Sequence, residues 1–225
     1  MGRNRVKMAV KAFAGGLLVL TILASGYTAY GYFDARHDAP QLSIRADQLI
    51  AQGHSAEGLG PGRIDQLLLV EDPGFWQHSG VDFSTNGQGV TTLTQGLGKS
   101  VGFAKFKPGI RKLRLMGYAM GLESKLSKSQ IIALALDEVE MGRGPTGWMK
   151  GFYSASNIIF ARSPDQLTEP EFLKLVAVLI APRNFDLKNG NVALKTRVGR
   201  IQRLVQGGCE PSGVADVWLE GCASF

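Results

Sequence analysis

The longest uncharged apolar stretch of the chain covers residues 12–33, close to the N-terminus. A helix of this length rises about 33 Å, enough to cross a hydrocarbon core of about 30 Å. The pattern therefore predicts a single membrane-spanning anchor over residues 12–33. A cleaved signal peptide is the alternative, because small residues such as Ala24 and Ser25 stand near the end of the stretch. The length of the apolar stretch favours the uncleaved anchor.

The charges that flank this stretch predict its orientation. The 225-residue chain has a net charge of +6, and part of that excess lies in a basic tail at residues 1–11. The cations of this tail are Arg3, Arg5, Lys7 and Lys11. Because basic flanks stay in the cytoplasm, we expect everything from Asp34 onward in the periplasm, outside the inner membrane. Tyr27, Tyr30 and Tyr32 are then expected at the periplasmic interface, and the membrane accounts for the basic tail without a nucleic-acid partner.

Helical periodicity dominates the rest of the chain. Residues 34–63 contain glycine, proline and scattered charge, which predicts a stalk with one short helix. Beyond it, apolar residues recur every three or four positions in several segments. These are residues 64–70, a pair of helices from 111 onward with a break near Ser127, a helix from the capping box Thr168/Glu171 to Pro182, and 192–205. With no long alternating stretch in the sequence, we expect one mostly α domain over residues 64–208.

Two cysteines stand in the tail formed by residues 209–225. Cys209 and Cys222 are separated by a segment that contains glycine and proline. In an oxidising compartment such a pair can close a short loop, so we expect a structural disulfide. Spacing alone leaves two free thiols as the alternative.

The segment EDPGFWQHSG, residues 71–80, carries the candidate chemistry. Glu71 ends an apolar run, and Phe75 and Trp76 are close enough in sequence to shield it from water. A shielded carboxyl has a pKa nearer neutrality and suits proton abstraction from a hydroxyl. We expect Asp72 and His78 to hold the turn by hydrogen bonds. The alternative is a pair of acids that only decorate a helix end beside core aromatics.

This segment and two later ones resemble the motifs of peptidoglycan glycosyltransferases. These are lysozyme-like membrane enzymes that polymerise lipid II, alone or as the N-terminal module of bifunctional penicillin-binding proteins. The first motif, E-D-x-x-F-x-x-H-x-G, is matched by Glu71, Asp72, Phe75, His78 and Gly80. The second is met by Gly89, Thr92, Thr94, Gln95, Leu97 and Lys99, with Thr91 in place of a serine. The third is met by Arg111, Lys112, Ala119, Leu122, Glu123, Ser127 and Lys128, and the resemblance extends over about residues 64–205.

The resemblance implies roles for these positions. Glu71 would be the general base, with Asp72, Phe75 and His78 supporting it. The cations that would neutralise the departing diphosphate are Lys99, Arg111 and Lys112, with Arg114 as an additional candidate. Thr92 and Gln95 would contact substrate. The implied partners are lipid II, the growing glycan strand, the membrane and other cell-wall synthesis proteins; no organic cofactor or protein metal site is implied, and Mg²⁺ or Mn²⁺ stays open as a cofactor.

The chain also departs from the motifs. Leu115 stands where the third motif has a second glutamate, Gly96 replaces a glutamine, Ser100 an asparagine and Ala133 a glutamate. An alkyl chain at 115 cannot manage phosphate charge. A carboxylate from Asp82, Asp137 or Glu138 entering the site near Leu115 would restore a two-acid arrangement.

Two alternatives to a polymerase follow from these departures. One is a noncatalytic member of the same fold that binds lipid-linked glycan or a cell-wall synthesis partner. The other is a lysozyme-like hydrolase that cuts finished glycan with Glu71, although glycan strands lack the pyrophosphate that Lys99, Arg111 and Lys112 would serve.

Overall fold

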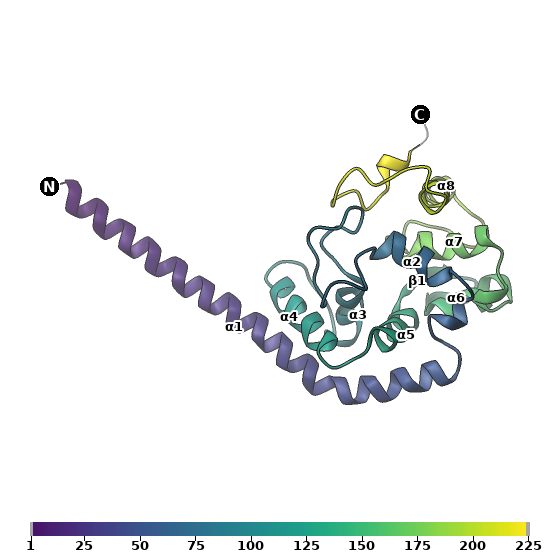
Figure 1. Ribbon diagram of the computed structural model, residues 1–225, viewed down its shortest axis with the longest axis horizontal. Helices are drawn as coiled ribbons and strands as arrows, with labels where there is room; N and C mark the ends of the chain where they lie inside the picture. Colours follow the sequence, from purple (N-terminus) through teal and green to yellow (C-terminus); the bar gives the residue numbers. More distant parts are fainter. Residues whose placement is uncertain (1, 224–225) are drawn as a thin grey trace.

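The computed structural model describes residues 2–223, without the side chains of residues 2–6, 9 and 12. The predicted cations Arg3 and Arg5 therefore lie outside the described side chains, whereas Lys7 and Lys11 are exposed. The chain begins with one helix, α1 (Gly2–Ala51), which projects far from the folded domain and bends where it runs along it (Figure 1). Pro40 lies inside α1 and is a sufficient cause for the bend, since proline removes a helix hydrogen bond and crowds the preceding turn.

The remaining described elements are helices and one hairpin. In chain order they are η1 (Glu57–Leu59), α2 (Arg63–Glu71), α3 (Leu93–Val101), α4 (Arg111–Glu123), α5 (Lys128–Glu138), β1 (Glu140–Gly144), β2 (Gly147–Lys150), α6 (Phe152–Phe160), η2 (Pro164–Gln166), α7 (Glu169–Val178), α8 (Val192–Val205) and η3 (Glu220–Cys222). The mostly α prediction is confirmed, as are the break near Ser127 and the capping box that starts α7 at Thr168. Ser127 also forms a capping box at the start of α5, which was not predicted.

The antiparallel hairpin of β1 and β2 was not predicted. Its register pairs Arg143 with Trp148 and Gly144 with Gly147. Among the residues of the two strands, only Met141, Gly142 and Met149 are buried. The strands therefore lack the regular alternation of buried and exposed residues that identifies a strand from sequence.

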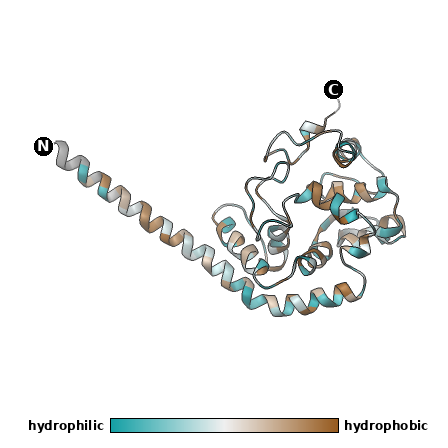
Figure 2. Ribbon diagram, viewed as in Figure 1, coloured by the Kyte–Doolittle hydropathy of each residue, from teal (hydrophilic) through white to brown (hydrophobic). Residues whose placement is uncertain are grey.

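The two halves of α1 have different surroundings. Its outer part is apolar and exposed. From Phe13 onward the helix is long and apolar enough to cross a membrane: an 18-residue segment of it has a mean hydropathy of 1.4, and none of that segment is buried. Figure 2 shows the change along α1 from apolar residues in the outer part to hydrophilic ones near the bend. The inner part buries Ala35, Ala39 and Ala46 against the domain. Residues 34–51 are therefore not a stalk, because packing of these small residues keeps the chain helical through residue 51, whereas residues 52–62 are irregular apart from η1.

The contact between α1 and α4 is close enough to require glycine. A Cβ on Gly117 would lie 1.8 Å from the carbonyl oxygen of Thr28, and one on Gly31 would overlap the backbone of Arg114. Below this contact, the Tyr118 hydroxyl donates a hydrogen bond of 2.7 Å to Asp38. Small residues let two helix backbones approach in this way, so the anchor helix is joined rigidly to the domain.

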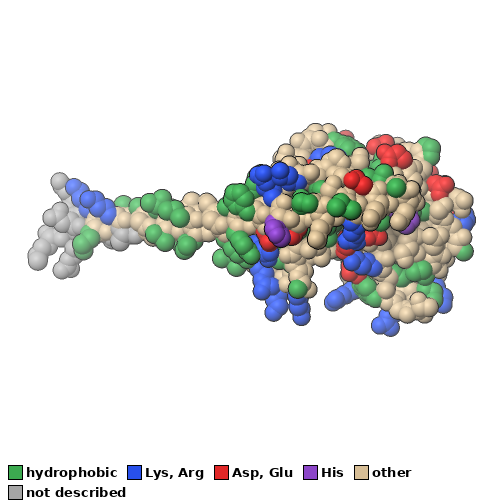
Figure 3. Space-filling view, turned by 90° about the horizontal axis from the view of Figure 1, so that it is seen from below, with side chains coloured by type: hydrophobic (Ala, Val, Ile, Leu, Met, Phe, Trp, Pro, Cys, Tyr) green, Lys and Arg blue, Asp and Glu red, His purple; other side chains and the backbone are tan. Residues whose placement is uncertain are grey.

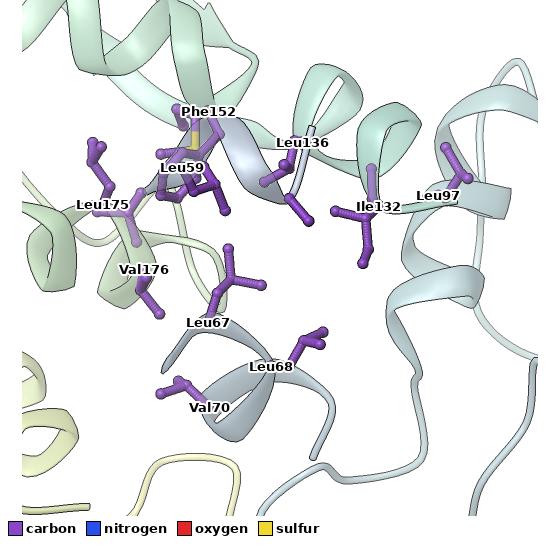
Figure 4. Packing of buried hydrophobic residues seen from close by; sticks show 14 of the residues in the cluster. Leu59, Leu67, Leu68, Val70, Leu97, Ile132, Leu136, Phe152, Leu175 and Val176 are labelled. Atoms are coloured by element: carbon purple, nitrogen blue, oxygen red, sulfur yellow. The ribbon is translucent and has the colours of Figure 1, made fainter. Parts of the chain in front are cut away.

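The buried face of α2 packs into the core. Figure 4 shows Leu67, Leu68 and Val70 of α2 among buried side chains from α5, α6 and α7. All three are at most 3% exposed. Their burial fixes α2 along its apolar face, and its last residue, Glu71, is thereby placed at the edge of the core.

Candidate functional site

Glu71 lies in the wall of a cavity of about 300 Å³. The cavity is formed by the end of α2, the loop before α3, one face of α3, and residues that precede β1, follow α7 and belong to the C-terminal tail. Its lining residues are Val70, Glu71, Gly87, Gln88, Thr91, Thr92, Leu93, Gly96, Lys99, Val139, Leu179, Ile180 and Val217. The second motif is thus brought directly against the acid of the first.

The environment of Glu71 suits a general base. Burial raises the pKa of its carboxyl from 4.5 to about 7, the cation of Arg197 opposes that rise, and the charge of Asp72 adds to it. Arg197 comes from α8 and is 3% exposed, and its Nε and Nη1 have no hydrogen-bond partner among the described residues. A carboxyl held near the midpoint of its titration at neutral pH can both take and release a proton.

Asp72 and His78 hold the turn after Glu71, as predicted. The fully buried Asp72 carboxylate accepts hydrogen bonds from His78 Nε2 at 2.9 Å and from the Leu93 amide at 2.7 Å. His78 Nδ1 accepts from the Gly80 amide at 3.1 Å, so the ring proton is on Nε2. These bonds join the turn to the first residue of α3, which fixes the acid relative to the second motif.

The aromatic residues of the first motif, which we expected to shield Glu71, lie outside the lining of its cavity. Phe75 is buried, and Lys128 Nζ lies 4.2 Å from the centre of its ring. Trp76 is 51% exposed, and neither aromatic lines the cavity. The apolar walls come instead from residues distant in sequence, among them Val139 and Leu179. Phe75 supports the turn from the core side.

Among the four predicted diphosphate cations, Lys99 is the one that lines the cavity, and burial lowers its pKa. Lys112 lies beside it: burial and the charge of Lys99 lower the Lys112 pKa to about 8. The Lys112 ammonium donates to the Val90 carbonyl at 2.8 Å, the Thr91 hydroxyl at 3.0 Å and the Gln95 side-chain oxygen at 2.8 Å. Lys112 therefore holds the loop before α3 in its present position.

The two arginines of this set point elsewhere. Arg111 is exposed at the start of α4 and donates to the Lys105 carbonyl at 2.9 Å. Arg114 forms an ion pair with Asp34 of α1 and lies 4.4 Å over the ring of Phe103. Figure 3 shows Lys and Arg side chains grouped on the domain close to where α1 meets it. The structure therefore places Arg114 in the helix contact and Lys99 in the cavity.

The predicted substrate contacts Thr92 and Gln95 are largely committed to structure. The Thr92 hydroxyl donates to the Gly80 carbonyl at 2.8 Å and accepts from the Gln95 amide at 3.1 Å, capping α3. Thr92 still lines the cavity. Gln95 is fully buried, with its side-chain oxygen on Lys112 and its side-chain nitrogen unpartnered among the described residues.

Among the described residues that line this cavity, none replaces the second acid of the family motif. Leu115 is fully buried against α3, where its Cδ1 lies 3.1 Å from the position of a Cβ on Gly98. Asp82 accepts from the amide of Ser84 within its own loop, and its hydrogen bonds lower its pKa to about 2. Asp137 pairs with Arg45 of α1. Neither acid lines the Glu71 cavity.

Glu138 lines a neighbouring cavity of about 330 Å³ that Lys99 also lines. Its carboxylate pairs with Arg45 at 2.6 Å and with Lys150. Gly96 belongs to both cavities, and nothing lies within 4 Å of where its Cβ would be. The loss of the motif's glutamine at 96 therefore leaves open space on both sides of Lys99.

Sequence reasoning missed Arg197 and Gln88. Arg197 lies on the buried stripe of α8 with Leu194 and Ile201, and an arginine on an apolar stripe was the available signal. Gln88 is 4% exposed and lines the cavity, and neither atom of its amide group has a hydrogen-bond partner among the described residues. Nothing in its local sequence marked it.

The two cysteines and the possible metal ligands are the remaining predicted features. Cys209 and Cys222 form a disulfide, as predicted. Residues 2–223 offer no group of three or more His, Cys, Asp or Glu side chains that could hold a metal ion. The described side chains alone therefore do not form a complete site for a divalent cation, and Mg²⁺ or Mn²⁺ stays an expectation.

Comparison with known proteins gives a consistent result. A family model described as transglycosylase matches residues 52–206. A chain of Cupriavidus necator that is provisionally named a transglycosylase is 25% identical over 219 residues, covering 89% of this chain and 88% of its own. The biosynthetic peptidoglycan transglycosylase of Marinomonas is 30% identical over 152 residues, covering 62% of this chain and 66% of its own. Penicillin-binding protein 1A of Escherichia coli is 26% identical over 207 residues, but this chain spans only 24% of its length.

Proposed function

Since the chain belongs to the transglycosylase family, we propose that it is a membrane-anchored peptidoglycan glycosyltransferase that polymerises lipid II, with Glu71 as the general base. The observation that carries this proposal is the shared cavity of Glu71 and Lys99. It supplies a carboxyl with a pKa of about 7 and, on the adjacent helix, the Lys99 ammonium, which forms no ion pair among the described residues.

The reaction follows from these two groups. Glu71 takes the proton of the acceptor sugar's 4-hydroxyl while the hydroxyl oxygen forms a bond to the anomeric carbon of the donor. The bond from that carbon to the lipid pyrophosphate breaks, and the leaving oxygen takes the electron pair. Lys99 stabilises the charge that develops on the diphosphate, and its burial strengthens the interaction because little water screens it. The proton on Glu71 then passes to solvent.

The proposal also includes the protein's position at the membrane and its binding partners. The exposed apolar part of α1 is the anchor, with its N-terminus in the cytoplasm. The domain then lies in the periplasm, where the Cys209–Cys222 bridge is stable. Lipid II and the growing glycan strand are the partners at the cavity, and other cell-wall synthesis proteins are partners outside it.

A catalytically degenerate binder of lipid II or of a cell-wall partner is the second candidate. The buried Leu115 favours it, because the phosphate-side carboxylate of the family motif is absent and no second acid lines the Glu71 cavity. Hydrolysis of finished glycan is supported less well, since such a substrate carries no diphosphate for Lys99 to neutralise.

The test is polymerisation of fluorescent lipid II by the full chain in detergent micelles. We expect glycan strands from the native protein and a loss of about 10²- to 10⁴-fold with Glu71→Gln. Lys99→Met should slow the reaction by about 10²-fold, whereas Lys105→Met, an exposed lysine outside the cavity, should leave it unchanged. Unchanged polymer with Glu71→Gln would exclude this base. Binding of lipid II without polymer identifies the binder, and fragments released from purified sacculi identify the hydrolase.

A further inference from the structure

The C-terminal segment closed by Cys209 and Cys222, here called the disulfide tail (residues 209–222), lies beyond the family match at 52–206. It is folded around one acid. The carboxylate of Asp216 accepts from the amides of Ser212 at 2.9 Å, Glu220 at 2.6 Å and Gly221 at 2.9 Å. The disulfide tail is therefore a compact loop with its own hydrogen-bond network.

This loop is held on α8. Arg200 donates both ends of its guanidinium to the Glu220 carboxylate, at 2.7 and 2.8 Å, and also bonds the Trp218 carbonyl. Arg203 Nε donates to the Cys222 carbonyl at 2.7 Å. A bidentate arginine contact fixes orientation as well as distance, so α8 sets where the disulfide tail lies.

From α8, the disulfide tail reaches the loop that precedes α3. The Gly87 amide donates to the Gly213 carbonyl at 3.0 Å, and the Gly89 amide donates to the Val214 carbonyl at 2.8 Å. A Cβ on Gly89 would lie 2.7 Å from Val217 Cγ1. Figure 1 shows the yellow C-terminal segment beside the blue loop before α3. Two hydrogen bonds and a contact that leaves no room for a side chain join the segments.

The joined segments form one side of the Glu71 cavity. Val217 of the disulfide tail lines it together with Gln88, which lies between the two bonded glycines. Gln88 is almost fully buried, yet its amide nitrogen and oxygen have no partners among the described residues. A buried, unpaired amide is unfavourable unless a ligand satisfies it. Hydroxyl and acetamido groups of a sugar offer the matching donors and acceptors.

We propose that the disulfide tail is a wall of the substrate cavity that positions Gln88 to bind the sugar of lipid II, and that the Cys209–Cys222 bond is required for this position. The inference rests on the proposed function and names a binding element for its substrate. Glu71 and Lys99 stand on α2 and α3, which bury Leu67, Leu68, Val70 and Leu97 in the core, to which the disulfide tail adds buried residues only from its last part, Leu219 and Cys222. Opening the bridge should therefore weaken substrate binding and spare the chemical step.

The first experiment compares oxidised and reduced full-length protein by amide hydrogen exchange. The chain has two cysteines and both are in this bridge, so a reductant acts on one bond. Reduction restores the freedom of a loop with a sequence separation of 13, and detachment should become easier by up to roughly a hundredfold. We expect exchange of the Gly87 and Gly89 amides to accelerate accordingly. Unchanged protection of these amides overturns the inference, whether or not the protein polymerises lipid II.

The second experiment measures KM and kcat for fluorescent lipid II. Reduction should raise KM about tenfold, as expected for one or two lost hydrogen bonds, and leave kcat close to its oxidised value. Gln88→Ala should raise KM similarly in the oxidised protein and add nothing in the reduced one, because both changes remove the same interaction. Gln77→Ala, an exposed glutamine outside the cavity, is the matched control.

The inference is overturned if reduction and Gln88→Ala have additive effects on KM, or if either change lowers kcat alone. If the native protein forms no polymer, the same comparison is made on the Kd of fluorescent lipid II. Failure of polymerisation then counts against the proposed reaction. An unchanged Kd on reduction counts against the proposed role of the disulfide tail as a wall of the substrate cavity.

Discussion

Replacing Glu71 by glutamine should stabilise the folded protein at neutral and alkaline pH while removing its activity. The prediction depends on the Glu71 carboxyl at the cavity wall, which is partly exposed and whose pKa rises from 4.5 to about 7 mainly because the charged form loses hydration. Between those two values the folded protein keeps a proton that the unfolded chain has released. Folding stability therefore falls as the pH rises through this window and levels off above it.

The magnitude follows from the same two pKa values. A rise from 4.5 to about 7 corresponds to roughly 3 kcal/mol of stability lost by the native protein above pH 7. Glutamine has nearly the same shape and does not titrate, so the variant lacks this loss. The difference in free energy of unfolding between Glu71→Gln and the native protein should therefore increase by roughly 3 kcal/mol from pH 4.5 to 8.

Urea unfolding of both proteins in detergent micelles, at several pH values from 4.5 to 8, measures this difference. Comparing the two proteins cancels the titration of every other group. The rate of polymerisation should mirror the curve, because at pH 6 only about a tenth of the protein carries an ionised Glu71. A stability difference that does not change with pH would show that Glu71 titrates normally and is not shielded, and the argument for it as the base would fail.

Two further substitutions test the packing that surrounds the site. Leu115→Glu restores the family's acid, but this position is fully buried against Gly98. The variant should therefore lower the free energy of unfolding by several kcal/mol and give no gain in activity. Leu115→Met, the control, should change the free energy of unfolding by less than about 1.5 kcal/mol in the same urea series. Gly117→Ala should destabilise by about 1 to 3 kcal/mol through its overlap with Thr28 of α1, whereas Gly199→Ala, a helical glycine with open space, should stabilise by up to about 1 kcal/mol. Equal effects of the two alanines would contradict the close helix contact.

Local features of the sequence predicted the parts of the site that depend on local structure. The spacing of Leu67, Leu68 and Val70 predicts the buried face of α2, and the polar groups of the next turn predict the Asp72–His78 hydrogen bond. The walls of the cavity could not be predicted in this way. Val139, Leu179 and Val217 reach it from three different parts of the chain, and only tertiary packing brings them together.

The same reasoning explains the errors. Phe75 and Trp76 are near Glu71 in sequence, but a turn directs neighbouring side chains to different sides, so sequence distance did not predict which side chains line the cavity. Arg114 belongs to a run of basic residues, and its ion pair with Asp34 depends on where α1 packs against the domain. In both cases a distant element decided the environment of the residue.

The largest error, over residues 34–51 of the predicted stalk, changes how the anchor relates to the site. A flexible stalk would let the domain rotate freely above the membrane. Instead α1 runs without interruption from the exposed apolar part into its contact with α4, and α4 carries Lys112, which holds the loop before α3. Each joint in this series is rigid: a glycine contact between helices, then an ammonium with three hydrogen-bond acceptors. The orientation of the Glu71 cavity relative to the apolar part of α1 is therefore set by packing, and under the proposed function a lipid-linked substrate would meet the cavity at a fixed angle to the membrane.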